Sequence, residues 1–183
     1  MPLVSWFVVK PVRVVAPTLV NVTCPRPTLC VDDPTRLDEA SALYTEAEAF
    51  VSANVEQIGR SPKLVFCSTE QCAQSFGLGR RAAVSVGTLG IVVGPRAWHD
   101  YLVRHEMIHY VQGRRLNVLR LLFMPKWFVE GMAYAMSGDP RVPLPEPFEG
   151  WREEFRAWHG RIDANALWAE ARKLELGAPS LAH

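Results

Sequence analysis

The sequence predicts an α+β fold, in which a small mixed sheet packs on a helix carrying a His-Glu-x-x-His motif and a mostly helical C-terminal part follows. Three observations predict this fold. Apolar residues recur at helical spacing over residues 35–58, two β-rich segments follow at 63–67 and 82–93, and the patterned segments after the motif are typical of helices. With 183 residues and 49% hydrophobic content, the chain has enough apolar material for one globular core.

Charge is nearly balanced along the chain. There are 20 basic and 19 acidic residues, a formal net charge of +1, with no long run of either sign. The lysines and arginines do not gather with aromatic residues into a stripe, so the sequence does not predict a nucleic-acid partner.

Residues 1–34 are expected to form an extended N-terminal segment, and residues 35–183 a single domain. The apolar run Leu3–Val9 is interrupted by Lys10 and Arg13. It is too short to span a membrane, and no charged region precedes it as in a signal peptide. Two interpretations stay open: the tail of a membrane anchor with Lys10 and Arg13 at the lipid boundary, or an extended segment packed on the domain.

The four cysteines form two close pairs in the sequence. Four cysteines allow three pairings, and the local pairs Cys24–Cys30 and Cys67–Cys72 are sterically favoured. An even count in two such pairs favours an oxidising compartment, which predicts an exported, periplasmic or outward-facing membrane-anchored protein. The alternative is a cytoplasmic protein with four buried free thiols.

The elements before the motif have clear boundary signals. The helix over 35–58 follows Asp-Pro and precedes Gly. The apolar run at 63–67 is typical of a buried strand. The capping-box spacing that starts at Ser68 predicts a short helix that ends at Gly77-Leu-Gly79. Residues 82–93 predict one or two strands with a bend at its glycines.

The motif itself lies in a predicted helix over residues 98–112, bounded by Pro and Gly. His105 and His109 are one turn apart, so both rings can reach one ion, while Glu106 lies about 100° round the helix. Apolar residues occupy both sides of this helix, which is typical of a core position. Two imidazoles in a core need partners, and a metal ion or ordinary hydrogen bonds can supply them.

Glu130 is the candidate third ligand, since catalytic zinc takes three protein ligands and leaves one position for water. It lies in a predicted helix over 127–137, which follows Pro125 and stops at Gly138-Asp-Pro. Its neighbours are apolar, and a buried glutamate is rare unless it is paired or bound to metal. The alternative is an exposed glutamate on an amphipathic helix.

The motif His-Glu-Met-Ile-His, together with Pro125-Lys-Trp-Phe-Val-Glu-Gly-Met-Ala-Tyr134, resembles the gluzincin metallopeptidases, most closely the small bacterial peptidase MA-like domains. The resemblance covers roughly residues 60–137. It implies a zincin-like fold, one zinc ion on His105, His109 and Glu130, and hydrolysis of a peptide or protein substrate with Glu106 as the general base for a water at the metal. It also implies that the strand before the metal helix lines the substrate cleft.

A donor for the transition-state oxyanion is also expected near the metal. The candidates are Tyr134, His159 and Arg161. Tyr134 lies one turn beyond Glu130, where a residue can instead orient a metal ligand. His159 lies where a downstream donor could return to the cleft, but it is equally consistent with a surface histidine.

Two other classes of protein stay open. One is a zinc-binding, non-proteolytic domain that binds a partner, although a structural site would not need the spare carboxylate of Glu106. The other is a membrane-associated assembly protein, suggested by the N-terminus and by the apolar, arginine-bearing residues 114–123, which we expect mainly to pack on the core. Beyond them, residues 139–147 predict a loop or lid, and 148–160 and 164–176 predict two helices.

Overall fold

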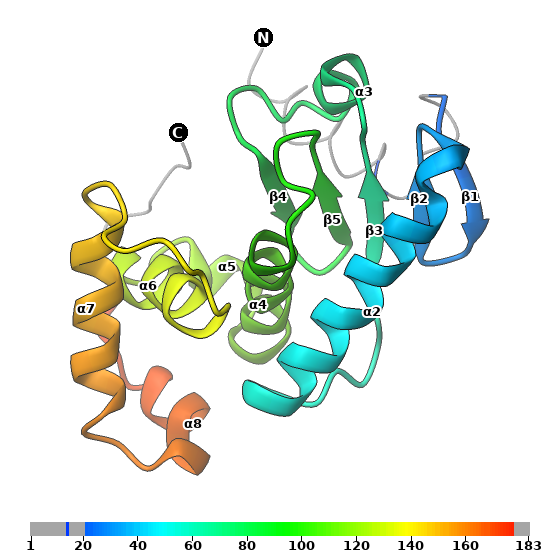
Figure 1. The fold of residues 1–183 in the computed structure, drawn as a ribbon. Coiled ribbons are helices and arrows are strands. Elements are labelled where there is room, and N and C mark those ends of the chain that lie inside the picture. The colour runs from blue at the N-terminus through cyan, green and yellow to red at the C-terminus, as the bar shows by residue number, and fades with distance from the viewer. Residues whose placement is uncertain (1–13, 15–20, 178–183) are drawn as a thin grey trace, which may run out of the picture.

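The structure, a computed structural model, describes Val14 and residues 21–177. It confirms a mixed α+β fold with a small mixed sheet followed by a helical C-terminal part (Figure 1). The five strands lie in the order β1-β2-β3-β5-β4. The inner strands β2 (Leu29–Val31), β3 (Lys63–Phe66) and β5 (Gly90–Val93) are parallel, while β1 (Thr23–Arg26) and β4 (Ala83–Val86) are antiparallel edge strands.

The sequence analysis missed the first two strands. Residues 23–31, expected to be part of the segment before the domain, form the β1–β2 hairpin, and β2 pairs directly with β3. β1 contains Pro25 and is followed by Pro27, and three of its four residues are exposed. Its sequence therefore lacks the alternating apolar pattern of a strand. The expected strands at 63–67 and 82–93 are confirmed, the latter as β4, a turn and β5.

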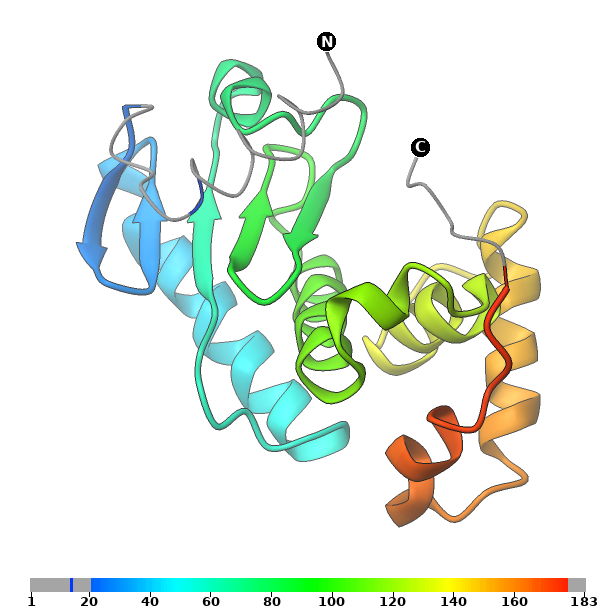
Figure 2. The same cartoon turned by 180° about the vertical axis from the view of Figure 1, so that it is seen from behind.

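Alternation along the strands divides the core into two layers. Leu64, Phe66 and Ile91 belong to the core cluster that they share with residues of the helices α2 (Leu37–Asn54) and α4 (Asp100–Leu116). Figures 1 and 2 show these two helices side by side next to the sheet. Val65 and Val92 point to the opposite face, where they pack with the short helix α3 (Glu70–Ser75). α4, which carries the motif, is therefore buried between the sheet and the helical part.

Two helix boundaries before the motif differ from those expected. The first helix, preceded by the 3-10 turn Pro34–Arg36, ends at Asn54 rather than near residue 58, because Val51 carbonyl oxygen accepts from both Val55 and Glu56 and closes the last turn. The N-cap of α3 is Thr69 and not Ser68. The Thr69 hydroxyl accepts from Cys72 N–H, while Ser68 N–H donates to Asp32.

The motif helix α4 is displaced toward its C-terminal end: it begins at Asp100 and continues through Gly113 to Leu116. Gly113 is buried, and a Cβ built there would lie 3.4 Å from Thr88 and 3.5 Å from Val118. These are ordinary contact distances, so Gly113 lies inside the helix without ending it and without being required by the packing. The turn into α5 (Val118–Leu121) is made by Asn117, with φ 71° and a side chain that accepts from Leu119 N–H.

The C-terminal part consists of α6 (Lys126–Met136), α7 (Phe148–His159), the 3-10 turn Ala164–Ala166 and α8 (Leu167–Ala171). The last helix is shorter than the expected 164–176. α6 and α7 pack closely because Gly131 faces Trp151: a Cβ on Gly131 would lie 2.2 Å from the Trp151 carbonyl oxygen. Phe128, Phe155 and Trp158 form the aromatic core between them.

Both favoured cysteine pairings are confirmed, as Cys24–Cys30 and Cys67–Cys72 disulfides. Two disulfides fit an extracellular or otherwise oxidising location. Among the described residues, no helix is both long and apolar enough to cross a bilayer. The apolar run Leu3–Val9 lies outside the described residues, so its two interpretations stay predictions.

Candidate metal centre

Three side chains from two helices converge where α4 crosses α6. His105 and His109 point from one face of α4, one turn apart, and Glu130 comes from the middle of α6. The two Nε2 atoms are 3.1 Å apart, and Glu130 Oε2 lies 3.6 Å from His105 Nε2 and 3.5 Å from His109 Nε2. All three side chains are at least three-quarters buried. This group could hold a metal ion.

Arg104 fixes the motif helix against its neighbours. Its guanidinium binds the Glu46 carboxylate of α2, with Nε 2.9–3.0 Å from the two oxygens, and lies 4.0 Å from the Phe50 ring centroid. It also donates to the Ser137 carbonyl at the end of α6. One side chain thus ties α2, α4 and α6 together, next to His105 in the sequence.

Gln112 determines which nitrogen of His109 faces the other two side chains. The Gln112 amide nitrogen donates to the Val129 carbonyl at 2.9 Å, which leaves its oxygen to accept from His109 Nδ1 at 2.8 Å. Nδ1 therefore carries a proton, and Nε2 faces His105 and Glu130. Gln112 is fully buried, so this orientation is rigid. The sequence analysis missed Gln112, although a polar residue three positions after His109 on a buried helix is a signal for it.

The two Nε2 atoms and the Glu130 oxygen that face one another require a proton or a metal ion between them. Two imidazole lone pairs and a carboxylate oxygen at these separations repel unless a proton or a metal ion binds between them. Burial lowers the pKa of His109, but Glu130 outweighs it and raises that pKa to about 9. Burial likewise opposes ionisation of Glu130, yet His109 holds its pKa well below the usual value. The group therefore favours bound positive charge.

His105 lies between the ligands and an aromatic wall. Its ring is 4.7 Å from that of His109 and 4.4 Å from that of Tyr134, centroid to centroid. Its Nδ1 is buried without a hydrogen-bond partner among the described residues. The polar contacts that the described residues make with this ring come from His109 and Glu130, the two side chains that could share a metal ion with it. A buried imidazole nitrogen without a partner does not fit an ordinary hydrogen-bonded core histidine.

Glu106 lies beside this group without joining it. It is half-buried, and the negative charge of its carboxylate contributes to raising the pKa values of both His109 and Tyr134. Within the described part of the chain, no hydrogen bond or ion pair engages it. Its carboxylate is thus available as a proton acceptor beside the ligands.

Tyr134 is the oxyanion candidate that the structure brings to the metal group. Burial, followed by the charge of Glu130, raises the pKa of its phenol to about 12, so the hydroxyl is a neutral donor at physiological pH. Its ring also contacts that of Phe148 at 5.2 Å. Both the donor role and an orienting role against His105 are open to this residue.

The other two oxyanion candidates lie at the far end of α7. The ring of His159 stacks on Phe155 with centroids 5.4 Å apart, and Phe155 in turn packs on Phe128. Arg161 follows the helix and is exposed, with its backbone N–H bonded to the Trp158 carbonyl. The structure does not bring either residue into contact with the metal group, and their catalytic roles stay untested predictions.

The expected loop over residues 139–147 contributes a residue that the sequence analysis did not single out. The Arg141 guanidinium lies 5.2 Å from the ring centroid of Tyr101, which is one turn before His105 on α4. Asp139 fixes this guanidinium through several hydrogen bonds. The Pro-rich loop thus places a guanidinium, held by Asp139, next to the N-terminal end of α4.

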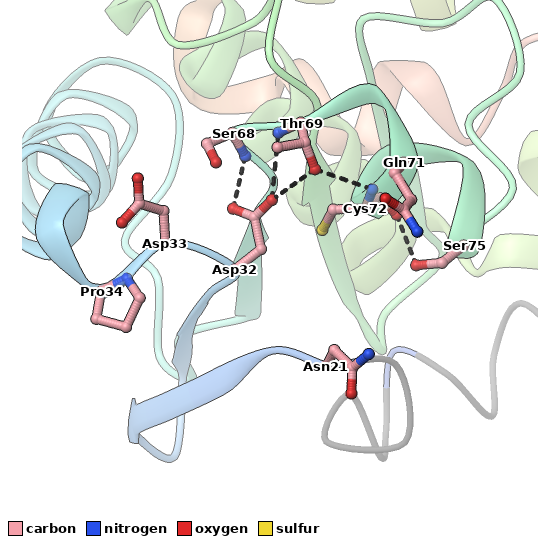
Figure 3. A pocket seen from close by; sticks show the side chains of 9 residues that line it. All are labelled: Asn21, Asp32, Asp33, Pro34, Ser68, Thr69, Gln71, Cys72 and Ser75. Carbon is pink, nitrogen blue, oxygen red and sulfur yellow. Dashed lines mark hydrogen bonds between the residues drawn. The ribbon is translucent and has the colours of Figure 1, made fainter.

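A separate pocket of about 530 Å³ lies between the end of β2 and α3 (Figure 3). None of the residues that line it belongs to α4 or α6. Its main carboxylate, Asp32, accepts from the backbone of Ser68 and Thr69 and from the Thr69 hydroxyl. These contacts give Asp32 a structural role at the start of α3.

Comparison with known proteins found no match: no family model, no curated protein and no solved structure matches this chain.

Proposed function

We propose that the protein is a zinc-dependent peptidase of the gluzincin type with a zincin-like fold. The observation that carries the proposal is the convergence of His105, His109 and Glu130, with the carboxylate of Glu106 left free beside them. Two histidines and one carboxylate are a ligand set of catalytic zinc sites, in which a fourth position stays open.

The separations fit a tetrahedral zinc ion, and the types of ligand favour zinc over the hard divalent ions. Zinc bonds to nitrogen and oxygen measure about 2.0–2.1 Å, so the ligand atoms of a tetrahedral site lie about 3.3–3.4 Å apart. The three separations here, 3.1, 3.5 and 3.6 Å, bracket that value. Calcium and magnesium favour sites built from oxygen ligands, which this group does not offer.

Each neighbouring residue then has a role in hydrolysis. Zinc bound here would lower the pKa of a water and polarise the substrate carbonyl. Glu106 would accept the proton of the attacking water and deliver it to the leaving amine. The neutral phenol of Tyr134 would donate a hydrogen bond to the oxyanion, while Gln112 keeps His109 in the correct tautomer.

The strand order changes which strand we expect to bind the substrate. β5, the strand before the metal helix, is fully buried between β3 and β4, so it has no free edge. The outer strand is β4, which is half-buried and packs beside α4. We therefore propose that an extended substrate would pair with β4 rather than with β5.

The test compares the wild type with Glu106→Gln, using an unfolded casein-like protein as substrate. We expect the wild type to cleave it with one zinc bound per chain. Glu106→Gln should keep the zinc and lose at least about a hundredfold in rate, the usual contribution of general-base catalysis. Glu153→Gln, which changes an exposed glutamate on α7, is the matched control and should cleave normally.

Two outcomes decide against the proposal. Cleavage that persists in Glu106→Gln would remove the proposed mechanism. A wild type that binds zinc but cleaves nothing would favour the alternative, a zinc-holding domain that binds a partner.

A further inference from the structure

Exposed apolar side chains gather around α5. The described residues include six large apolar side chains with substantial exposure, and five of them lie here. We call these five the apolar patch: Leu89, Leu119, Leu122, Phe123 and Leu176, exposed by 46, 69, 38, 38 and 47%. The sixth, Val142, lies in the Pro-rich loop. Such a gathering is unusual on a soluble surface and indicates an interaction site.

Three segments that contact one another form the patch. A Cβ on Gly87, in the β4–β5 turn that carries Leu89, would lie 3.2 Å from Val118 of α5. On the other side, Gly177 N–H donates to the Phe123 carbonyl at 2.8 Å, which holds the neighbouring Leu176 beside α5. Figure 2 shows α5 between this turn and the red C-terminal residues.

The segment around α5 is only partly packed on the core. Leu116 and Leu121 pack on the core, as expected for residues 114–123, and Met124 beyond them is also buried. Leu119 of α5, and Leu122 and Phe123 in the turn after it, are instead exposed, so the expected packing holds for only part of this segment.

The rim of the patch is basic. Arg114 is exposed at the end of α4, and Lys126 begins α6. Arg120 and Arg172 donate to backbone carbonyls rather than to carboxylates, so these contacts leave their positive charge uncancelled. Arg115 is paired with Glu56, and Glu175 is the opposing charge nearby. Positive charge therefore predominates around the apolar side chains.

We propose that the apolar patch docks on the surface of an anionic lipid bilayer. Apolar side chains ringed by lysine and arginine insert at the headgroup boundary and are attracted by anionic lipids. This inference is independent of the proposed peptidase activity.

The test is co-sedimentation of the full chain with phosphatidylcholine vesicles, with or without about 30% phosphatidylglycerol, a composition in the range of anionic membranes. We expect binding to the anionic vesicles, and at least a tenfold loss in the triple variant Leu119→Ser, Leu122→Ser, Phe123→Ser. Arg114→Gln should weaken binding less, and about 1 M salt should weaken it because screening shortens to about 3 Å. Val142→Ser, which removes the exposed valine outside the patch, should bind as the wild type does.

Unchanged zinc content and melting temperature will show that the triple variant is folded. The proposal is overturned if that variant sediments like the wild type, which would assign binding to the N-terminal run. It is also overturned if the wild type binds neither kind of vesicle, or both equally. A wild-type dimer that the triple variant dissociates would instead make the patch a subunit interface.

Discussion

At the scale of single residues, the geometry of the metal group depends on neighbouring side chains that orient its members. The Gln112 amide oxygen accepts a hydrogen bond from His109 Nδ1–H, which turns Nε2 toward the site, and the Gln112 amide nitrogen donates to the Val129 carbonyl. Val129 precedes Glu130, so the same contact joins the histidine helix to the carboxylate helix. Ligand orientation and helix packing are therefore coupled through one buried amide.

Removing that amide should weaken the site without abolishing it. We expect Gln112→Leu to bind zinc about 10–100-fold more weakly, since loss of an orienting partner typically costs this much. Gln112→Glu, which keeps an acceptor for Nδ1, should stay within about tenfold of the wild type. Chelator competition measures both affinities. A folded Gln112→Leu protein with wild-type affinity would show that Gln112 does not orient His109.

The residue types of the site could be predicted from the sequence, but their partners could not. Motif spacing placed His105 and His109 on one face, and the apolar setting of Glu130 predicted its burial. The Arg104–Glu46 contact joins residues 58 positions apart, and nothing local in the sequence specifies it. Such tertiary pairings depend on the helix packing itself.

At the scale of elements, the α6–α7 contact holds Glu130 in place. Gly131 follows Glu130 and lies directly against the Trp151 backbone, so the two helices approach more closely than any side chain would allow. The sequence predicted both helices but not this role for Gly131. Helix ends were predicted least well, because backbone contacts such as that of Val51 decide them.

Substitution of this glycine tests the contact. Gly131→Ala should lower the free energy of unfolding by about 3 kcal/mol, the upper end of the cost of overpacking, because the obstacle is a backbone carbonyl. It should also reduce zinc affinity by displacing Glu130. Gly59→Ala, at a position with open space around it, should stay within about 0.5 kcal/mol. Urea unfolding measures both, and equal stability of the two variants would contradict the close contact.

The contribution of the loop after α6 to stability should fall at low pH. Burial raises the pKa of Asp139, but hydrogen bonds from Arg141 outweigh it and hold the pKa below the usual 3.8. The stabilisation is then present above pH 3.8 and is lost as the pH falls through the lower folded-state value. We expect Asp139→Asn to lower the urea midpoint at pH 7 and to lower it less at pH 3, because part of the stabilisation is lost once the pH falls below 3.8. An equal effect at both pH values would show that the ionised carboxylate does not stabilise the loop.

At the scale of the whole molecule, the sheet connects both disulfides to α4. One disulfide joins β1 to β2, and the other joins the end of β3 to α3. The Cys67 carbonyl accepts from Trp98 Nε1 at 2.9 Å, just before α4 begins. The α+β class, the strands at 63–67 and 82–93 and both disulfides followed from sequence patterns or local spacing. The β1–β2 hairpin did not, because its short strands are recognisable only through pairing with β3.

Reduction should therefore destabilise the protein measurably. Each disulfide closes a loop of five or six residues, which stabilises by about 2 kcal/mol in the chain-entropy account. The double variants Cys24→Ser/Cys30→Ser and Cys67→Ser/Cys72→Ser should each lose about that amount in urea unfolding. If wild-type stability were unchanged by dithiothreitol, the disulfides would not contribute to the fold.

The central claim is that two imidazoles and one carboxylate hold a single zinc ion with one position open to water. X-ray absorption at the zinc edge of the zinc-loaded protein tests it most directly. We expect nitrogen and oxygen neighbours at about 2.0–2.1 Å, with outer scattering from two imidazole rings that falls to one ring in His109→Ala. Sulfur scattering at about 2.3 Å, or a wild-type spectrum without imidazole, would contradict the account.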